Sequence, residues 1–226
     1  QDTYVRLDKE IERLLNYLDN NIGENKYTLF LTADHGATDA PGFLKDNKIP
    51  VNYFNSKKFK YHIEKSLIKM FGSKYIISGN SNQQIYLNHE LIDKLNLNLN
   101  LVKKNVINAI QSFPGIDNVY SSEQILDGSD GHFIKLIRNG FNINLSGDIM
   151  YTMMPNWTYY RKGSTHGRRF NHDTHVPLIL YGNGIKKGST NRETDVIDIA
   201  PTVAAVLGIN SPNASTGRVI FEAIND

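Results

Sequence analysis

One short stretch of this sequence places an acid beside an imidazole where an apolar run ends. TADHGA, at residues 32–37, carries Asp34 and His35 just after that run. In an open α/β sheet, ligands bind outside the carboxyl ends of the strands, and Gly36 lets the backbone turn there. A carboxylate oxygen and an imidazole nitrogen are the donors that a zinc-like ion accepts where thiolate is absent. For a bare Asp-His pair, however, a helix-capping aspartate beside a surface histidine is the commoner explanation.

A second stretch, GSTHGRRFNHDTHVPLILYG at residues 163–182, is richer in imidazole. It places four candidate side chains before another apolar run: His166, His172, Asp173 and His175. The glycines near His166 let the backbone approach an ion closely. Asp173 and His175 are two residues apart, so in an extended segment they share a side, as a pair that supports metal ligands from behind would. Taken alone, this stretch is also compatible with an ordinary histidine-rich loop.

Composition limits the possible partners and cofactors. The chain has 226 residues, 40% of them hydrophobic, which suits one domain or one domain with a small insertion. Its net charge of +2 argues neither for nucleic acid nor for an anionic membrane as partner, and no apolar run reaches the roughly 20 residues of a membrane-spanning helix. Because the chain has no cysteine, any metal ion is held by oxygen and nitrogen.

Local charge is less even between residues 41 and 80. Eight lysines lie there, with aromatic residues such as Tyr53, Phe54, Phe59 and Tyr61 among them: Lys45, Lys48, Lys57, Lys58, Lys60, Lys65, Lys69 and Lys74. Such a cluster could form a nucleic-acid stripe or a field that attracts anionic substrates. The commoner origin is a solvated helix face.

The remaining patterns alternate between helices and strands, as in an α/β fold. Apolar spacing predicts helices over residues 3–20 and from about Asp198 to Gly208, and buried strands over 27–32, 148–153 and 177–181. The continuous apolar character of 27–32 favours a parallel strand covered on both faces. We therefore expect an α/β sheet flanked by helices, formed by residues 1–43 and 141–226.

Residues 44–140 have a rhythm of their own and predict a small inserted α+β subdomain. Its expected elements are helices over 57–71 and about 102–113 and short strands over 85–87 and 119–120. LNLNLNL, at residues 95–101, alternates like a strand but lies between two helical patterns. We interpret it as a turn with Asn100 as the helix cap.

Several motifs taken together resemble the alkaline phosphatase superfamily. They are TADHGA, GSTHG, DTHVPLILYG, DIAPTVAAVLGI and STGRVI, and they occur in the order typical of that family. The likeness is strongest to the bacterial phosphate-irrepressible alkaline phosphatases, relatives of the nucleotide pyrophosphatase/phosphodiesterases. It covers nearly the whole chain, and the order of several motifs is more specific than any one of them.

This resemblance implies a phosphomonoester hydrolase with two zinc ions and a phosphoenzyme mechanism. Asp34 and His35 match the paired ligands of one zinc, and His166 matches a ligand of the other. Asp173 and His175 match positions that support metal ligands from behind. The family further implies a periplasmic or secreted protein whose partner is a phosphate monoester, with no nucleic-acid or membrane partner.

The chain also departs from the family pattern. The family's threonine or serine nucleophile, its other zinc ligands and the side chains that grip the phosphoryl group all precede the helix predicted at 3–20. Zinc takes about four ligands, so these 226 residues resemble a C-terminal portion with no catalytic nucleophile. We expect the chain alone to be inactive and the missing N-terminal portion to be its partner. Two alternatives are a phosphodiesterase or sulfatase of the same superfamily and a non-catalytic module that keeps the fold.

Overall fold

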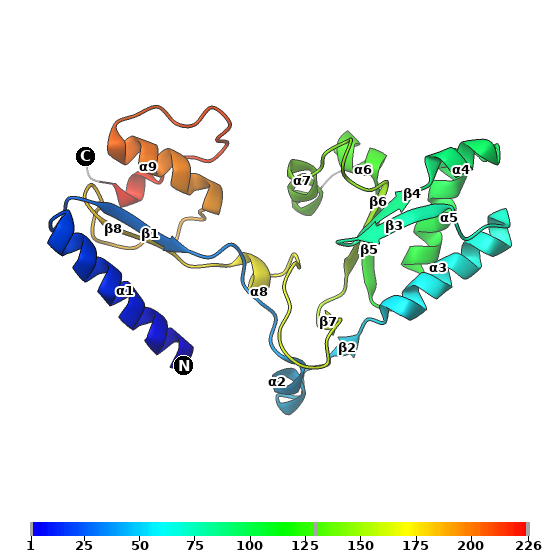
Figure 1. The fold of residues 1–226 in the computed structure, drawn as a ribbon, viewed down its shortest axis with the longest axis horizontal. Helices are drawn as coiled ribbons and strands as arrows, with labels where there is room; N and C mark the ends of the chain where they lie inside the picture. Colours follow the sequence, from blue (N-terminus) through cyan, green and yellow to red (C-terminus); the bar gives the residue numbers. More distant parts are fainter. Residues whose placement is uncertain (1, 129–130, 225–226) are drawn as a thin grey trace. The chain divides into compact units, whose positions relative to one another are not determined.

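The computed structural model describes residues 2–128 and 131–224. The chain divides into two compact units (Figure 1), which are described separately. The terminal unit combines Gln1–His35 with His175–Asp226, and the central unit is Gly36–Thr174. These divisions differ from the expected boundaries at residues 44 and 140, and the inserted subdomain stays a prediction.

A four-stranded antiparallel sheet organises the central unit. Its strands are β3 (Ile77–Ser81), β4 (Gln84–Leu87), β6 (Ile149–Met153) and β5 (Ile116–Ser121), in that spatial order. Buried and partly exposed residues alternate along β6, as the period of two in a strand requires. We expect this strand in the main sheet with 177–181, whereas the structure pairs it with β4 and β5.

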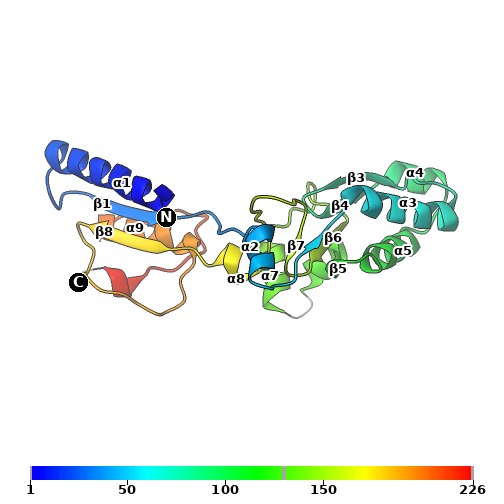
Figure 2. The same cartoon turned by 90° about the horizontal axis from the view of Figure 1, so that it is seen from below.

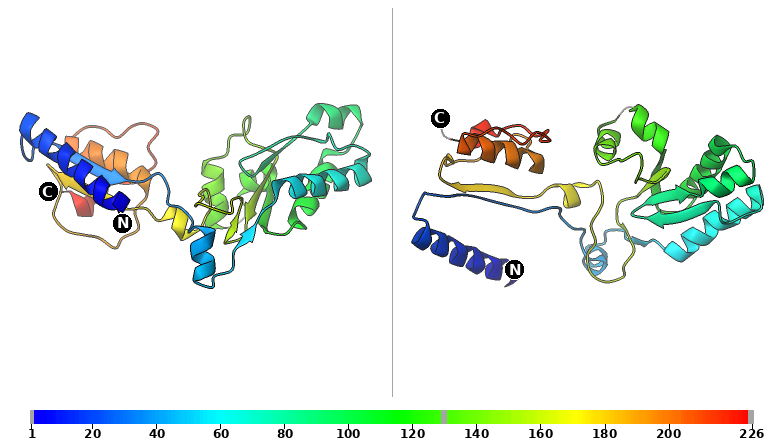
Figure 3. Two further views of the ribbon diagram at one scale, coloured as in Figure 1. Left: turned by 60° about the horizontal axis from the view of Figure 1, so that its bottom comes forward. Right: turned by 45° about the horizontal axis from the view of Figure 1, so that its top comes forward.

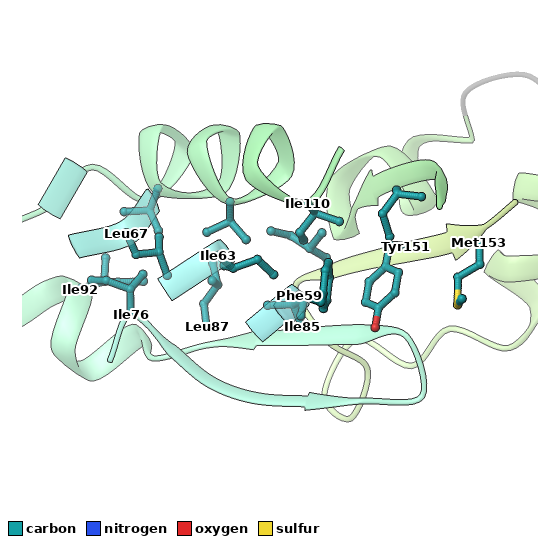
Figure 4. Close-up of a cluster of buried hydrophobic side chains, with 14 of the residues drawn as sticks. Phe59, Ile63, Leu67, Ile76, Ile85, Leu87, Ile92, Ile110, Tyr151 and Met153 are labelled. Atoms are coloured by element: carbon teal, nitrogen blue, oxygen red, sulfur yellow. The ribbon is translucent and has the colours of Figure 1, made fainter. Parts of the chain in front are cut away.

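Two amphipathic helices pack against the sheet to form the apolar core of this unit. In α3 (Ser56–Phe71), Phe59, Ile63 and Leu67 recur every four residues and are almost fully buried. Helix α5 (Leu99–Gln111) adds Val102, Val106 and Ile110 to the same cluster. Figure 4 shows labelled side chains from α3, α5, β4 and β6 meeting in one layer.

Side-chain caps set the ends of both helices. Asn55 accepts a hydrogen bond from the backbone N of Lys58 at the start of α3, and Gly72 ends that helix in the left-handed region. Asn98 accepts from the backbone N of Leu101, so it caps α5. The prediction that Asn100 is the cap is therefore wrong by two residues.

Short elements complete the central unit. They are α2 (Pro41–Asp46), β2 (Asn52–Tyr53), α4 (His89–Lys94), α6 (Ser122–Asp127), α7 (His132–Asn139), β7 (Trp157–Thr158) and α8 (Asn171–Thr174). Strands β2 and β7 pair in parallel.

The terminal unit is built around two strands. Its elements are α1 (Asp2–Asn21), β1 (Thr28–Thr32), β8 (Leu178–Gly182), the 3-10 turn η1 (Val196–Asp198), α9 (Ile199–Leu207) and the 3-10 turn η2 (Phe221–Ala223). Strands β1 and β8 pair side by side (Figure 2), with α1 and α9 on opposite sides of them (Figure 3). Among the described residues of α1, none is buried.

The pairing of β1 with β8 shows that the prediction of a parallel, fully covered strand at 27–32 is wrong. Strand β1 runs antiparallel to β8, with Thr28 opposite Gly182 and Thr32 opposite Leu178. Phe30 is 46% exposed and Ile179 is 53% exposed. A continuous apolar run indicates that a strand needs cover, but it encodes neither the direction of its neighbour nor the source of that cover.

The two C-terminal motifs pack together in the terminal unit. Asp198 is 3% exposed, and its carboxylate accepts hydrogen bonds from the backbone N of Arg218 and of Asp195. Thr202 donates to the Asp198 carbonyl and accepts from the backbone N of Ile220. DIAPT and STGRVI therefore hold η1, α9 and the final segment together. Within the described part of the chain, no helix is long and apolar enough to span a membrane.

Candidate metal-binding loops

The loop after β1 presents Asp34 and His35 with their polar groups near each other. The His35 Nε2 atom lies 3.5 Å from Asp34 Oδ2, and the backbone N of His35 donates to Asp34 Oδ1 at 3.0 Å. The Asp34 side chain is 88% exposed and that of His35 is 39% exposed. This accessible oxygen and nitrogen pair fits the donor chemistry of a zinc-like ion.

The residues that follow His35 pair with the histidine-rich loop inside the central unit. The backbone N of Gly36 donates to the Asp173 carbonyl at 2.7 Å, and that of Thr38 donates to the Thr165 carbonyl at 2.8 Å. The backbone N of Thr165 donates in turn to Thr38 Oγ1 at 3.0 Å. Two stretches far apart in the sequence are thus joined by three hydrogen bonds.

Gly36 is required for this close approach. A Cβ atom at this position would lie 2.0 Å from the carbonyl oxygen of His172, a distance that no side chain tolerates. The glycine in TADHGA therefore serves the contact between the two loops. The sequence alone indicates only its use in the turn after the strand.

Asp173 organises the loop that carries His166. It is 3% exposed, and its Oδ2 accepts a hydrogen bond from the backbone N of Arg168 at 2.5 Å. This contact closes the turn at Gly167, whose φ of 90° favours glycine. The buried Asp173 carboxylate thus holds the backbone two residues after His166, which suits the supporting role expected for it, and that role stays a prediction.

The other predicted site residues are distributed over both units. His166 is exposed in the central unit, and His175 is exposed at the start of the segment leading into β8 in the terminal unit. Within the described ranges, no three His, Cys, Asp or Glu side chains form a group that could hold a metal ion. The expected convergence of Asp34, His35 and His166 stays a prediction.

Sequence reasoning missed a buried polar cluster in the central unit. The Nζ atom of Lys103, a residue only 7% exposed, lies 2.5 Å from Glu123 Oε1 and 3.8 Å from Asp148 Oδ1. Asp148 also accepts from the backbone N of Leu87 and contacts His89 Nε2 at 2.8 Å. The cluster links α5 and α6 to the sheet, so its role is structural. Lysine in the helical pattern of α5 gave no signal of burial.

Sequence reasoning also missed Arg168. Its Nη1 and Nη2 atoms are buried and have no hydrogen-bond partner among the described residues. Burial lowers the pKa of its guanidinium from the ordinary value, against the opposing influence of Tyr159, Asp173 and Tyr151. The only sequence signal was the pair of arginines directly after His166 and Gly167.

Comparisons with known proteins agree on the kind of protein that this chain resembles. The family described as "Type I phosphodiesterase / nucleotide pyrophosphatase" matches residues 1–177. Over 99% of the chain, it is 37% identical to a protein of Myroides odoratus named calcium-transporting ATPase and 34% identical to alkaline phosphatase PafA of Elizabethkingia meningoseptica. The crystal structure of wild-type PafA matches 99% of the chain with a TM-score of 0.90 and 35% identity.

These matches cover only part of each relative. The chain spans 42% of the Myroides protein, 41% of the curated PafA sequence and 43% of the PafA chain in the crystal. The likeness therefore extends through the whole described chain but through about two fifths of these larger proteins.

Proposed function

The chain belongs to the type I phosphodiesterase/nucleotide pyrophosphatase family, and from this premise we propose that it is the C-terminal part of a metal-dependent phosphomonoester hydrolase. Its fold is the α/β fold of alkaline phosphatase PafA, over 43% of that chain. The observation that carries the proposal is the pairing of Gly36 and Thr38 with Asp173 and Thr165. This pairing joins the two loops whose residues match metal ligands of the family.

Three residues of this chain would hold metal in the complete enzyme. Asp34 and His35 supply an oxygen and a nitrogen to one zinc ion, and His166 supplies a nitrogen to a second. Two such ions would stabilise charge on the attacking and leaving oxygens of an in-line phosphoryl displacement. The exposure of Asp34 and His35 supports this assignment, because ligands must be reachable by an ion and by a substrate.

Asp173 and His175 are assigned as supporting residues. The Asp173 carboxylate fixes the backbone at Arg168, which limits the positions that the nearby His166 can take. Its carbonyl receives the Gly36 backbone N, so the same residue anchors both loops. The part played by His175 rests on the family likeness alone.

The nucleophile and the remaining ligands are proposed to lie in the larger part of the protein that this chain does not include. Two relatives that are named alkaline phosphatases, PafA and PhoV, each share 34% identity with the chain, which favours monoester hydrolysis. The expected location is the periplasm or the outside of the cell. A phosphodiesterase or a sulfatase of the same superfamily is the second candidate, since the family description itself names phosphodiesterase.

Metal content and activity of the complete protein test the proposal. We expect His166→Ala and Asp34→Asn each to lower the bound zinc from two ions to about one and to reduce p-nitrophenyl phosphate turnover by at least ~10³-fold, since nucleophile and metals act as a unit. His172→Ala is the matched control, because His172 contributes its carbonyl to the loop and no proposed ligand. Unchanged zinc content in both variants would refute the assignment. Turnover of bis-p-nitrophenyl phosphate or p-nitrophenyl sulfate above that of the monoester would favour the second candidate.

A further inference from the structure

A groove of about 660 Å³ lies at the start of helix α3 in the central unit. It is lined by residues of β2, the first turn of α3, the turn after α5, and β7 with the segment that follows it. Every lining residue belongs to the central unit, so the groove does not depend on the terminal unit. None of them is a proposed metal ligand or a sequence neighbour of one.

Positive charge gathers at this groove without a counter-charge. The described residues that line it include three cations, Lys57, Lys58 and Arg161, and no carboxylate. All three residues are exposed, so a ligand can reach them from solvent. No carboxylate of the described residues forms an ion pair with any of them. An anion in the groove would therefore meet several accessible cations whose charge is not neutralised there.

Two of these lysines stand where they oppose the stability of their own helix. Lys57 and Lys58 lie in the first turn of α3, a 16-residue helix with no acidic residue in that turn. The N-terminal end of a helix carries a partial positive charge, so cations are unfavourable there and anions are favourable. The charge of this turn thus suits an anion from outside the chain.

Aromatic side chains line the same groove. Trp157, the only tryptophan of the sequence, is partly buried there, and Tyr159 is 37% exposed. A Cβ atom at Gly115 would lie 2.3 Å from the Trp157 ring, so this glycine lets the indole pack closely against the backbone. The indole is thereby held at the groove as a surface on which a flat ligand ring can stack.

We propose that this groove binds a phosphate ester that carries a flat ring, with the ring against Trp157 and the phosphate near Lys57 and Lys58. The guanidinium of Arg161, which lies over the ring of Tyr53 at 4.8 Å, adds a further cation. A nucleotide and an aryl phosphate share this chemistry. Ring stacking supplies one part of the affinity and charge attraction the other. The proposal does not rest on the metal ligands assigned above.

Calorimetric titration of the 226-residue chain with AMP in the presence of EDTA tests the proposal. EDTA removes metal ions, so the proposed zinc ligands do not contribute to the signal. We expect AMP to bind, and both adenosine, which lacks the phosphate, and ribose phosphate, which lacks the ring, to bind at least ~10-fold more weakly. Phenyl phosphate distinguishes the two sources, since binding tighter than that of AMP assigns an aryl phosphate and weaker binding a nucleotide. Equal affinity for AMP and ribose phosphate, or no AMP binding up to about 10 mM, would overturn the proposal.

A matched pair of double variants tests the charge. Lys57→Gln with Lys58→Gln is expected to weaken AMP about 5-fold at low salt and to leave the affinity for adenosine unchanged, because two attractive charges are lost. This variant should unfold at the same temperature as the unaltered chain or higher, since cations leave the helix N-terminus. Lys65→Gln with Lys69→Gln is the control, because both lysines are exposed on α3 and neither lines the groove. An equal loss of AMP affinity in the two double variants would contradict the assignment to the groove.

Trp157 tests the ring and reports the location of the ligand. Trp157→Leu is expected to weaken AMP at least ~10-fold and to leave the affinity for ribose phosphate unchanged, because only the stacking surface is lost. Circular dichroism checks that this variant folds. The unaltered chain gives a second readout, since its tryptophan emission comes from Trp157 alone. Unchanged emission at AMP concentrations that saturate the calorimetric signal would place the ligand elsewhere and overturn the proposal.

Discussion

The two units of this chain bury their apolar residues to very different extents. In the central unit, residues from two helices and a four-stranded sheet close a shared core, with Ile76, Val102 and Ile110 wholly inaccessible to solvent. In the terminal unit, the described residues of α1 include no buried side chain, and both strands expose large apolar residues. The same chain therefore contains one self-sufficient layer structure and one with uncovered faces.

This difference concerns how completely each unit covers its own strands. A sheet of two strands alone is marginally stable in water. Independent stability usually requires three or more strands with a covered apolar face. The central unit meets that condition, whereas β1 and β8 pair only with each other. Exposed apolar surface on this scale is typical of an interface. We propose that the larger part of the protein covers this surface.

Hydrogen exchange gives the largest expected contrast between the units. Amides of β4 and β6 are expected to be protected by ~10³-fold or more over those of β1 and β8, because exchange in a core strand requires global unfolding. Mass spectrometry of peptides from the intact chain measures this. Equal protection in the two units would show that the terminal unit is stable as it stands, and the comparison would fail.

Matched truncations of two phenylalanines sharpen the comparison in terms of stability. Phe59→Ala is expected to cost about 3–5 kcal/mol of unfolding free energy, because Phe59 is 1% exposed within the core. Phe30→Ala in β1 is expected to change it by less than about 0.5 kcal/mol, since 46% of that residue is already exposed. Urea denaturation followed by circular dichroism measures both values. A larger loss of unfolding free energy for Phe30→Ala than for Phe59→Ala would contradict the conclusion that the central unit has the better-covered core.

Thr202 joins two segments of the terminal unit through buried hydrogen bonds. Thr202→Val keeps the shape but removes the donor to the Asp198 carbonyl and the acceptor for the Ile220 backbone N. The expected cost is about 1–3 kcal/mol, because buried groups are left unsatisfied. It is measured as faster hydrogen exchange in α9, with Thr190→Val at an exposed position as the control. Unchanged exchange in α9 would show that this contact does not hold the unit together.

The smallest expected effect concerns pH and the central unit. Burial raises the pKa of the Glu123 carboxyl, but the hydrogen bonds from Lys103, from its own backbone and from Ser121, with the charge of Lys103, together outweigh it, so the pKa falls to about 2 from the ordinary 4.5. Because the pKa of this carboxyl is lower in the folded state, its ionised form stabilises the fold at pH values above the ordinary pKa of 4.5. This contribution is lost as the pH falls from 4.5 towards 2. Glu123→Gln should therefore flatten the dependence of the urea midpoint on pH in that window. The effect is small because the side chain is 56% exposed. If the slope of the urea midpoint against pH is unchanged in Glu123→Gln, Glu123 does not contribute to the loss of stability in acid.

Local patterns in the sequence predicted the elements of the central unit well. The spacing of Phe59, Ile63 and Leu67 gave helix 57–71, and the structure has Ser56–Phe71. The alternation of LNLNLNL misplaced the cap of α5 because Asn98 and Asn100 are equally good capping residues. Only the contact with Leu101 N distinguishes them.

Sheet assembly was predicted less well, since strand order depends on contacts between distant residues. Nothing in Ile149–Met153 states that its neighbours are β4 and β5, and nothing in β1 states that its partner is antiparallel. The family was predicted correctly from the order of motifs. Arg168 was missed because the burial of an arginine is a tertiary property. Gly36 was noticed for its turn, while its essential contact is with His172, far along the chain.

The central claim is that this chain supplies metal ligands but not a complete catalytic site. Its most direct test is p-nitrophenyl phosphate turnover by the purified 226-residue chain with added zinc, compared with an Asp34→Ala control that exposes contaminating phosphatase. The account predicts no turnover above the control, because a site without a nucleophile has no attacking group. Zinc-dependent turnover that disappears in the Asp34→Ala variant would show that the chain carries its own nucleophile and would contradict the claim.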